Sequence, residues 1–263
     1  MENEKLLKLR KFNMIMGGLH LIQGIIMLIL AGTVIQNISE FKPTITQIYL
    51  FYNTNTMSLE TGIKQLFDLP FGVLVAVFLL LSALAHAIIS LPKFTNDIYN
   101  KDLEKGINKF RWFEYALSSS VMIVLIATLF GVYDIATLLL IFVVNALMNI
   151  FGLYMEKLNS GRDKKNINWG PFVYGTIAGL LPWVVIIIYM TGNGNYDMVP
   201  WFVWAIVGTY FVAFNTFPIN MILQYKGIGK WKDYLYGERT YIVLSLVAKS
   251  ILAWLVLFGA MQP

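Results

Sequence analysis

The chain has 263 residues, of which 57% are hydrophobic and 13% are charged. Soluble domains carry about 25% charged residues, so this composition excludes a soluble enzyme, and its hydrophobicity excludes a disordered chain. Cysteine is absent, which excludes a disulfide scaffold, a thiol nucleophile and a cysteine-ligated metal. In a membrane protein the net charge of +5 has meaning only through its distribution among the loops.

Seven stretches are long and apolar enough to cross a bilayer, whose core of about 30 Å needs roughly 20 mostly apolar helical residues. The predicted fold is an all-α membrane protein, a seven-transmembrane-helix bundle formed by a single domain over residues 1–263. In chain order the predicted spans are residues 12–35, 68–92, 110–131, 134–156, 169–190, 200–224 and 239–261. Lysines precede the first span as in a signal peptide, but its apolar stretch exceeds the usual length of about 7–15 residues. It is therefore predicted to be a retained helix.

The connections are short, except for residues 36–67. This segment contains the stretch Thr46–Tyr52, which is rich in strand-forming residues. We expect a small β-hairpin outside the bilayer.

Lysine and arginine are distributed very unevenly between the two sides. Of the 20 in the chain, 17 lie in the N-terminal segment and around the loops after the second, fourth and sixth spans, whereas Lys42 and Lys64 lie on the other side. The positive-inside rule then predicts a multi-pass protein of the cell membrane, with its N-terminus in the cytoplasm and its C-terminus outside. Lys249 is the one basic residue left over, and it falls deep inside the seventh span.

Glu114 is the one acidic residue predicted inside a span, because the other 14 fall in the N-terminal segment, in loops or at span ends. An unpaired charge at bilayer depth costs at least about 2.5–3.5 kcal/mol, so Glu114 and Lys249 are expected to pair. The alternatives are a purely structural ion pair or a lysine that reaches the membrane surface. Lys249 follows the start of its span by some ten residues, or about 15 Å at 1.5 Å per residue, which disfavours the second alternative.

A desolvated lysine amine is a usable nucleophile toward a carbonyl. An aldehyde would give a Schiff base, whose protonated form needs a counter-anion, and Glu114 is the carboxylate available for it. Aromatic residues of the last three spans would suit a long polyene, although contact with lipid and packing between helices explain such residues equally well. They are Trp183, Trp201, Trp204, Phe211, Phe214, Phe217 and Trp254.

Two stretches resemble the heliorhodopsins, an inverted-topology family of microbial rhodopsins. They are residues 223–254, which contain Lys249, and Arg111–Ser120, which contains Glu114. His20 and His86 also fall where that family carries histidines, and the resemblance covers the whole chain. It implies all-trans-retinal bound to Lys249, with Glu114 as the counterion.

The resemblance also implies a wider cofactor-binding set. Ser245 stands one helical turn before Lys249, where other microbial rhodopsins usually carry a second carboxylate, and it cannot hold a negative charge. Phe214 and Asn145 resemble pocket positions. The two matching stretches add Tyr115, Ser118 and Trp254 to the predicted set.

His20 and His86 are predicted at matching depth in the cytoplasmic half, where with Glu114 they would form a cluster that holds a proton. Satisfied core histidines are the plainer alternative. Imidazole suits zinc, but two histidines and one carboxylate are a poor ligand set, so we expect no metal site.

The outer half lacks an ionisable relay between Lys249 and the three outer aspartates, Asp68, Asp134 and Asp197. An ion pump needs polar steps on both sides of the Schiff base. We therefore expect a retinal-binding photoreceptor with a slow, non-pumping photocycle. The alternatives are a light-driven ion channel or transporter with the same Schiff base, and a membrane enzyme or carrier in which Lys249 and Glu114 bind another substrate. No motif of a conventional enzyme is present.

The expected partners follow from the resemblance and from the loops. The family is associated with dimers, and residues 36–67 are our candidate for part of the interface. The basic inner loops 93–109 and 225–239 could contact a cytoplasmic signalling partner, or equally well anionic lipid headgroups. No nucleic-acid partner is expected.

Overall fold

The computed structural model describes residues 2–34, 42–192, 199 and 201–260. Within these residues, seven helices are long and apolar enough to cross a membrane, which confirms the predicted bundle. They cover Glu4–Gly32, Phe71–Ser90, Lys109–Leu129, Ile135–Asn159, Gly170–Thr191, Trp201–Lys226 and Tyr234–Leu257. A two-stranded antiparallel sheet accompanies them.

The elements follow in the order α1, π-helical η1, β1, β2, α3 to α9 and, between α8 and α9, the 3₁₀ turn η3. Their bounds are α1 Glu2–Ile29, η1 Leu30–Val34, β1 Thr44–Asn53, β2 Ser58–Asp68, α3 Phe71–Ser90, α4 Lys93–Glu104, α5 Lys109–Leu129, α6 Ile135–Asn159, α7 Gly170–Thr191, α8 Trp201–Lys226, η3 Gly229–Lys232 and α9 Tyr234–Ala260.

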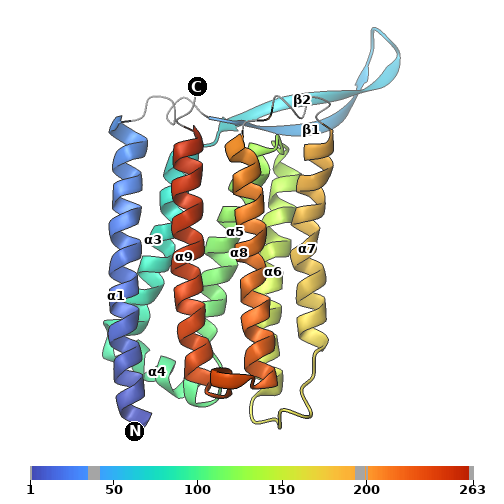
Figure 1. The fold of residues 1–263 in the computed structure, drawn as a ribbon. Helices are drawn as coiled ribbons and strands as arrows, with labels where there is room; N and C mark the ends of the chain where they lie inside the picture. Colours follow the sequence, from blue (N-terminus) through green and yellow to red (C-terminus); the bar gives the residue numbers. More distant parts are fainter. Residues whose placement is uncertain (1, 35–41, 193–198, 200, 261–263) are drawn as a thin grey trace.

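The spanning helices run side by side (Figure 1). α1 packs on α3, α3 on α5, α5 on α6 and α6 on α7, while α9 closes the bundle by packing on α8, α1 and α3. The backbones of α7 and α8, which are consecutive in the chain, have few close approaches, and aromatic side chains meet between them, with Trp183 packed on Tyr210, Phe211 and Phe214. The main core lies between the helices, and its centre includes Phe78, Ile123, Ile126, Ile186 and Ala253.

The first and second spans differ from their predicted bounds at the N-terminal side. α1 begins at Glu2 instead of near residue 12, because Leu6 and Leu9 are buried against Tyr99 and Ile242 and so hold nearly three additional turns in place. Residue 68 belongs to β2, and α3 begins only at Phe71.

α4, Lys93–Glu104, is an additional helix within residues 93–109, which the sequence predicts to be a loop. Pro92 precedes it with a φ of −74°, which suits a helix start. Its buried residues Asn96, Tyr99, Asp102 and Leu103 recur at helical spacing. The Asn96 amide donates to the Ile89 carbonyl at 2.8 Å, which fixes α4 against the end of α3.

The predicted hairpin is confirmed as β1 and β2, and it extends sideways from one end of the bundle (Figure 1). Its anchor is the loop before α6, where the Thr46 amide donates to the Tyr133 carbonyl at 2.9 Å. The Asp134 carboxylate accepts from the Ile48 amide at 3.3 Å and also caps α6 by accepting from the Thr137 amide at 2.9 Å. One carboxylate therefore ties the hairpin to a spanning helix.

Replacement of Asp134 by alanine is expected to loosen both elements. Although partial burial opposes it, hydrogen bonds from Thr137 and Ile48 hold the pKa of Asp134 below its ordinary value of 3.8. The carboxylate thus contributes stability at neutral pH, and this contribution disappears as the pH falls through the lowered pKa. Loss of such a cap costs about 1 kcal/mol.

Amide hydrogen exchange tests this prediction. The amides of Ile48 and Thr137 should exchange faster in Asp134→Ala at pH 7, whereas Asp134→Asn, which keeps an accepting oxygen, should stay close to the parent. Equal exchange in all three proteins would show that Asp134 does not anchor the hairpin.

Candidate functional site

Lys249 of α9 and Glu114 of α5 meet in the middle of the bundle. Both side chains are buried, and the Lys249 Nζ lies 2.5 Å from the Glu114 Oε1. Ser82 of α3 completes the group, because its hydroxyl donates to the same carboxylate oxygen at 2.6 Å and also contacts the amine. The lysine therefore does not reach the membrane surface, and one acid neutralises one base inside the bundle.

Two further predicted residues surround this pair. The Tyr115 ring centroid lies 5.4 Å from the Lys249 amine, and its hydroxyl donates to the Tyr241 carbonyl at 3.0 Å. Ser245 is buried one turn before Lys249, and it lines a small cavity together with Ser82 and Glu114. Both residues are therefore where the sequence predicts them.

A larger cavity of about 330 Å³ begins at the Lys249 side chain and runs between α5, α6, α7 and α8. Trp183, Tyr210 and Phe214 form part of its wall, and the Trp183 ring centroid lies 5.5 Å from that of Tyr210 and 6.1 Å from that of Phe214. An apolar, aromatic-walled space that opens at a buried amine fits a conjugated aldehyde. These side chains would hold a retinal chain.

The structure does not bring all the predicted pocket residues to this cavity. Trp201 and Trp204 are exposed in the first turn of α8, and the Trp254 indole donates instead to Gln23 of α1 at 3.3 Å. None of the three lines this cavity, because a hydropathy pattern gives the length of a span but not the direction of each side chain.

Asn145 and Ser118 are buried close to the cavity but are not among the residues that line it. The Asn145 amide donates to Ser119 at 2.8 Å and to Ser120 at 3.0 Å, and Ser119 does line the cavity. Asn145 therefore hydrogen-bonds to one residue of the cavity wall, while Ser118 lies one turn beyond Glu114 in α5.

His20 and His86 come together on the side of the Lys249–Glu114 pair that we predict to face the cytoplasm. Their rings stack with centroids 5.7 Å apart. The His86 Nδ1 lies 2.9 Å from the Asn13 Oδ1, whereas both His20 nitrogens are buried without a hydrogen-bond partner among the described residues. His86 lines the same small cavity as Glu114, whose volume of about 40 Å³ is enough for ordered water.

Comparison with protein families supplies the deciding observation: the heliorhodopsin family model matches residues 9–261. The chain belongs to the heliorhodopsin family. No curated protein sequence matches the chain. Membership implies a retinal chromophore and a multi-pass membrane protein, and it places this heliorhodopsin in a light-sensing family rather than among canonical enzymes.

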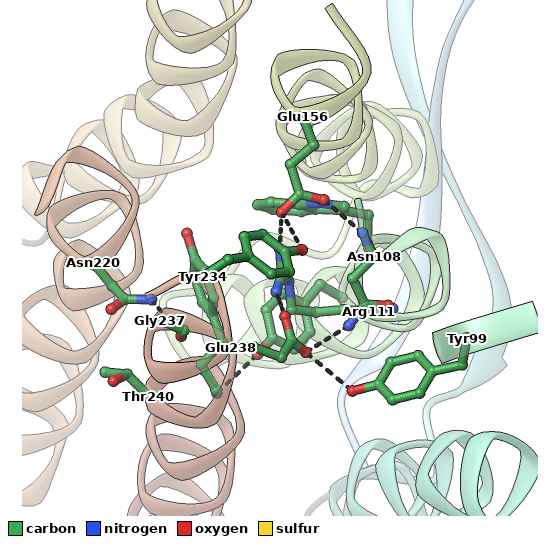
Figure 2. A network of polar contacts seen from close by, with 12 residues as sticks. Tyr99, Asn108, Arg111, Glu156, Asn220, Tyr234, Gly237, Glu238 and Thr240 are labelled. Atoms are coloured by element: carbon green, nitrogen blue, oxygen red, sulfur yellow. Dashed lines mark hydrogen bonds and ion pairs between the residues drawn. The ribbon is translucent and has the colours of Figure 1, made fainter. Parts of the chain in front are cut away.

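This heliorhodopsin also contains a second buried charge cluster, which sequence reasoning missed (Figure 2). Arg111 of α5 forms ion pairs with Glu156 of α6 and Glu238 of α9. The prediction that Glu114 is the one acid within a span is therefore wrong. α6 and α9 extend past the predicted span ends and bury both of these carboxylates at the end of the bundle that carries α4.

Neutral donors complete the cluster. Glu156 accepts from the Asn108 amide at 2.8 Å and from the Trp112 indole at 2.7 Å. Glu238 accepts from the Asn108 side chain at 2.6 Å and from the Tyr99 hydroxyl at 3.5 Å. Burial, with the nearby Glu238 carboxylate, raises the pKa of Tyr99 well above its usual value, so this hydroxyl stays a donor.

The two polar groups of this heliorhodopsin are connected. Asn13 bridges them, since it contacts His86 and its amide donates to the Tyr99 hydroxyl at 3.4 Å, which in turn reaches Glu238. The small cavity is also lined by Arg111 and Glu238 as well as by Glu114. The spacing of Arg111, Glu114 and Ser118 along one helix face was the sequence signal that could have suggested this column.

Proposed function

We propose that this protein is a photoreceptor that binds all-trans-retinal on Lys249, with Glu114 as its counterion, and that it does not transport ions. The observation that carries the proposal is a buried amine, paired with one carboxylate, at the start of an aromatic cavity. Bound retinal would supply light absorption and isomerisation. Lys249 would hold it, Glu114 would balance its charge, and Ser82 would orient that carboxylate.

The distribution of ionisable groups supports the non-transporting role. Toward the cytoplasmic end, Glu114, His86, His20 and the Arg111 cluster follow one another. Toward the other end, the described parts of the spans have no carboxylate, histidine, lysine or arginine beyond Lys249. We propose that His20 and His86 keep a released proton inside the protein, so that the photocycle is slow and returns the proton to its origin.

Two measurements test this function. Purified protein mixed with all-trans-retinal should gain a strong visible absorption band, and a protein that stays colourless would refute the retinal-binding role. A pH electrode in a suspension of illuminated cells should record no sustained change. A sustained, uncoupler-sensitive pH change would instead favour the light-driven transporter.

Replacement of Glu114 by glutamine is expected to move the visible band to longer wavelength. Without the carboxylate, the positive charge of the protonated Schiff base on Lys249 would no longer be held at the nitrogen by an anion and would spread along the polyene. Glu156→Gln is the matched control, because Glu156 is also buried and ion-paired but lies in the Arg111 cluster. An unchanged spectrum in Glu114→Gln would assign the counterion role to another residue.

We also propose that the hairpin forms part of a homodimer interface and that the N-terminus lies in the cytoplasm. Large apolar side chains are exposed on both strands, among them Ile48, Leu50, Leu59 and Ile63. α1 begins at the end of the bundle that carries α4 and η3, opposite the hairpin (Figure 1), and this end holds the basic loops. Light scattering of a variant with Ile48→Ser and Ile63→Ser should show monomers if the hairpin joins two copies.

A further inference from the structure

The large cavity opens sideways between α7 and α8. Thr176 and Leu180 of α7, together with Phe211 and Ile219 of α8, line the cavity and are also exposed on the outer surface of the bundle. The backbones of α7 and α8 have few close approaches. Their side chains meet where Trp183 packs on Tyr210, Phe211 and Phe214, and the cavity continues beyond this contact toward Pro171 and Ile222. In a membrane this slot faces the acyl chains of lipids.

The cavity extends well away from Lys249. Its α7 wall runs from Trp183 back to Pro171, a distance of about 18 Å along a helix that rises 1.5 Å per residue. In α8 it continues to Ile222, one turn before the helix ends at Lys226. We call this part, lined by Gly152, Pro171, Phe172, Gly175 and Ile222, the lower arm. These residues are apolar, and Gly152 and Gly175 allow Trp112 and Phe151 to pack closely beside the arm.

Positive charge lies at the end of the lower arm. Lys164, from the loop before α7, lies against Gly227 immediately after α8, so this loop reaches across to the end of α8. Lys164 and Lys226 are both exposed, and the described residues provide no carboxylate partner for either. Arg162 and Lys165 add two more positive charges nearby, against one negative charge from Asp163.

We propose that the lower arm binds one acyl chain of an anionic phospholipid, whose headgroup lies on Lys164 and Lys226. The apolar slot suits a hydrocarbon chain because it opens toward the bilayer, and the two lysines stand where that chain would meet its phosphate. Basic residues at the membrane surface favour anionic headgroups by about fivefold per lysine. The proposal takes from the proposed function only the orientation that makes this leaflet the cytoplasmic one.

Lipid retention and crosslinking test this site on the full chain. The protein is placed in nanodiscs with equal amounts of phosphatidylcholine and phosphatidylglycerol, and lipids that stay bound are counted by native mass spectrometry. We expect one phosphatidylglycerol to be retained in preference to phosphatidylcholine. A diazirine at the end of its acyl chain should crosslink to residues of the lower arm. Equal retention of both lipids, or crosslinks spread evenly over all the spans, would overturn the proposal.

Variants separate the headgroup from the chain. Lys164→Gln with Lys226→Gln should reduce the preference for phosphatidylglycerol at least about fivefold, whereas Lys93→Gln with Lys101→Gln should not. Ile219→Trp should block the slot and remove the lower-arm crosslinks, whereas Ile177→Trp, an exposed isoleucine of α7 outside the cavity, should leave them. Retention that is unchanged in the lysine variant, or crosslinks that persist in Ile219→Trp, would refute the site.

The wild-type measurements need no variant to fold and no chromophore to bind. A colourless protein that still prefers phosphatidylglycerol would refute the photoreceptor and keep the lipid site. A coloured protein without lipid preference would refute the lipid site and keep the photoreceptor.

Discussion

Lys249→Ala is expected to remain colourless when mixed with all-trans-retinal, while the wild type gains a visible band. The amine is buried at the start of the aromatic cavity, and Lys249 is the one lysine among the described residues that line it. Absorption spectroscopy of the purified proteins measures the effect, which should be complete. A visible band in Lys249→Ala would place the attachment site elsewhere.

Loss of folding must be separated from loss of the amine in this experiment. Lys249→Ala leaves the Glu114 carboxylate buried without a cation, and such a charge costs about 3–5 kcal/mol. The double variant Lys249→Ala with Glu114→Gln removes both charges, so it should recover most of the thermal stability and still stay colourless. If the double variant is as unstable as the single one, the buried carboxylate is not the cause of the instability.

Arg111→Gln is expected to lower the stability of the protein strongly. It leaves Glu156 and Glu238 buried together with no cation between them, at a cost of about 3–5 kcal/mol. Glu238→Gln should cost much less, because Arg111 then faces a single carboxylate and the cluster becomes neutral. The midpoint of thermal unfolding in detergent measures both.

The test is whether Arg111→Gln has a lower unfolding midpoint than Glu238→Gln. Arg162→Gln, which removes an exposed arginine from a nearby loop, serves as the control and should leave the midpoint unchanged. A midpoint for Glu238→Gln as low as that for Arg111→Gln would mean that hydrogen bonds, and not charge balance, hold the cluster together.

Much of the fold could be predicted because a bilayer imposes simple demands on a sequence. Long apolar segments identified the seven spans, and the strand-forming residues of Thr46–Tyr52 identified the hairpin. The pairing of Lys249 with Glu114 could be predicted as well, because two isolated charges at bilayer depth are stable only together. The structure confirms this pairing, because the Lys249 amine and the Glu114 carboxylate form a buried ion pair.

The rest depends on helix rotation and on exact helix ends, which hydropathy does not encode. Trp201 and Trp254 were assigned to the pocket because they are aromatic, yet they face away from it. Arg111 was counted with the loop charges because it stands at a predicted span start, where arginines usually reach water. Its partners are Glu156 of α6 and Glu238 of α9. They lie 45 and 127 residues away in the sequence, so no local pattern reveals the contact.

The location of these charges in the chain bears on the order in which the protein assembles as it is synthesised. The N-terminal helices enter the membrane first, so α5 and α6 can already neutralise Arg111 with Glu156. Among the described residues the ion-pair partner of Glu114 is Lys249, which arrives only with α9, and α9 also brings Glu238 to Arg111. α9 follows the other six spanning helices in the chain and thus completes both clusters, so synthesis that stops before it would leave Glu114 buried without its ion-pair partner.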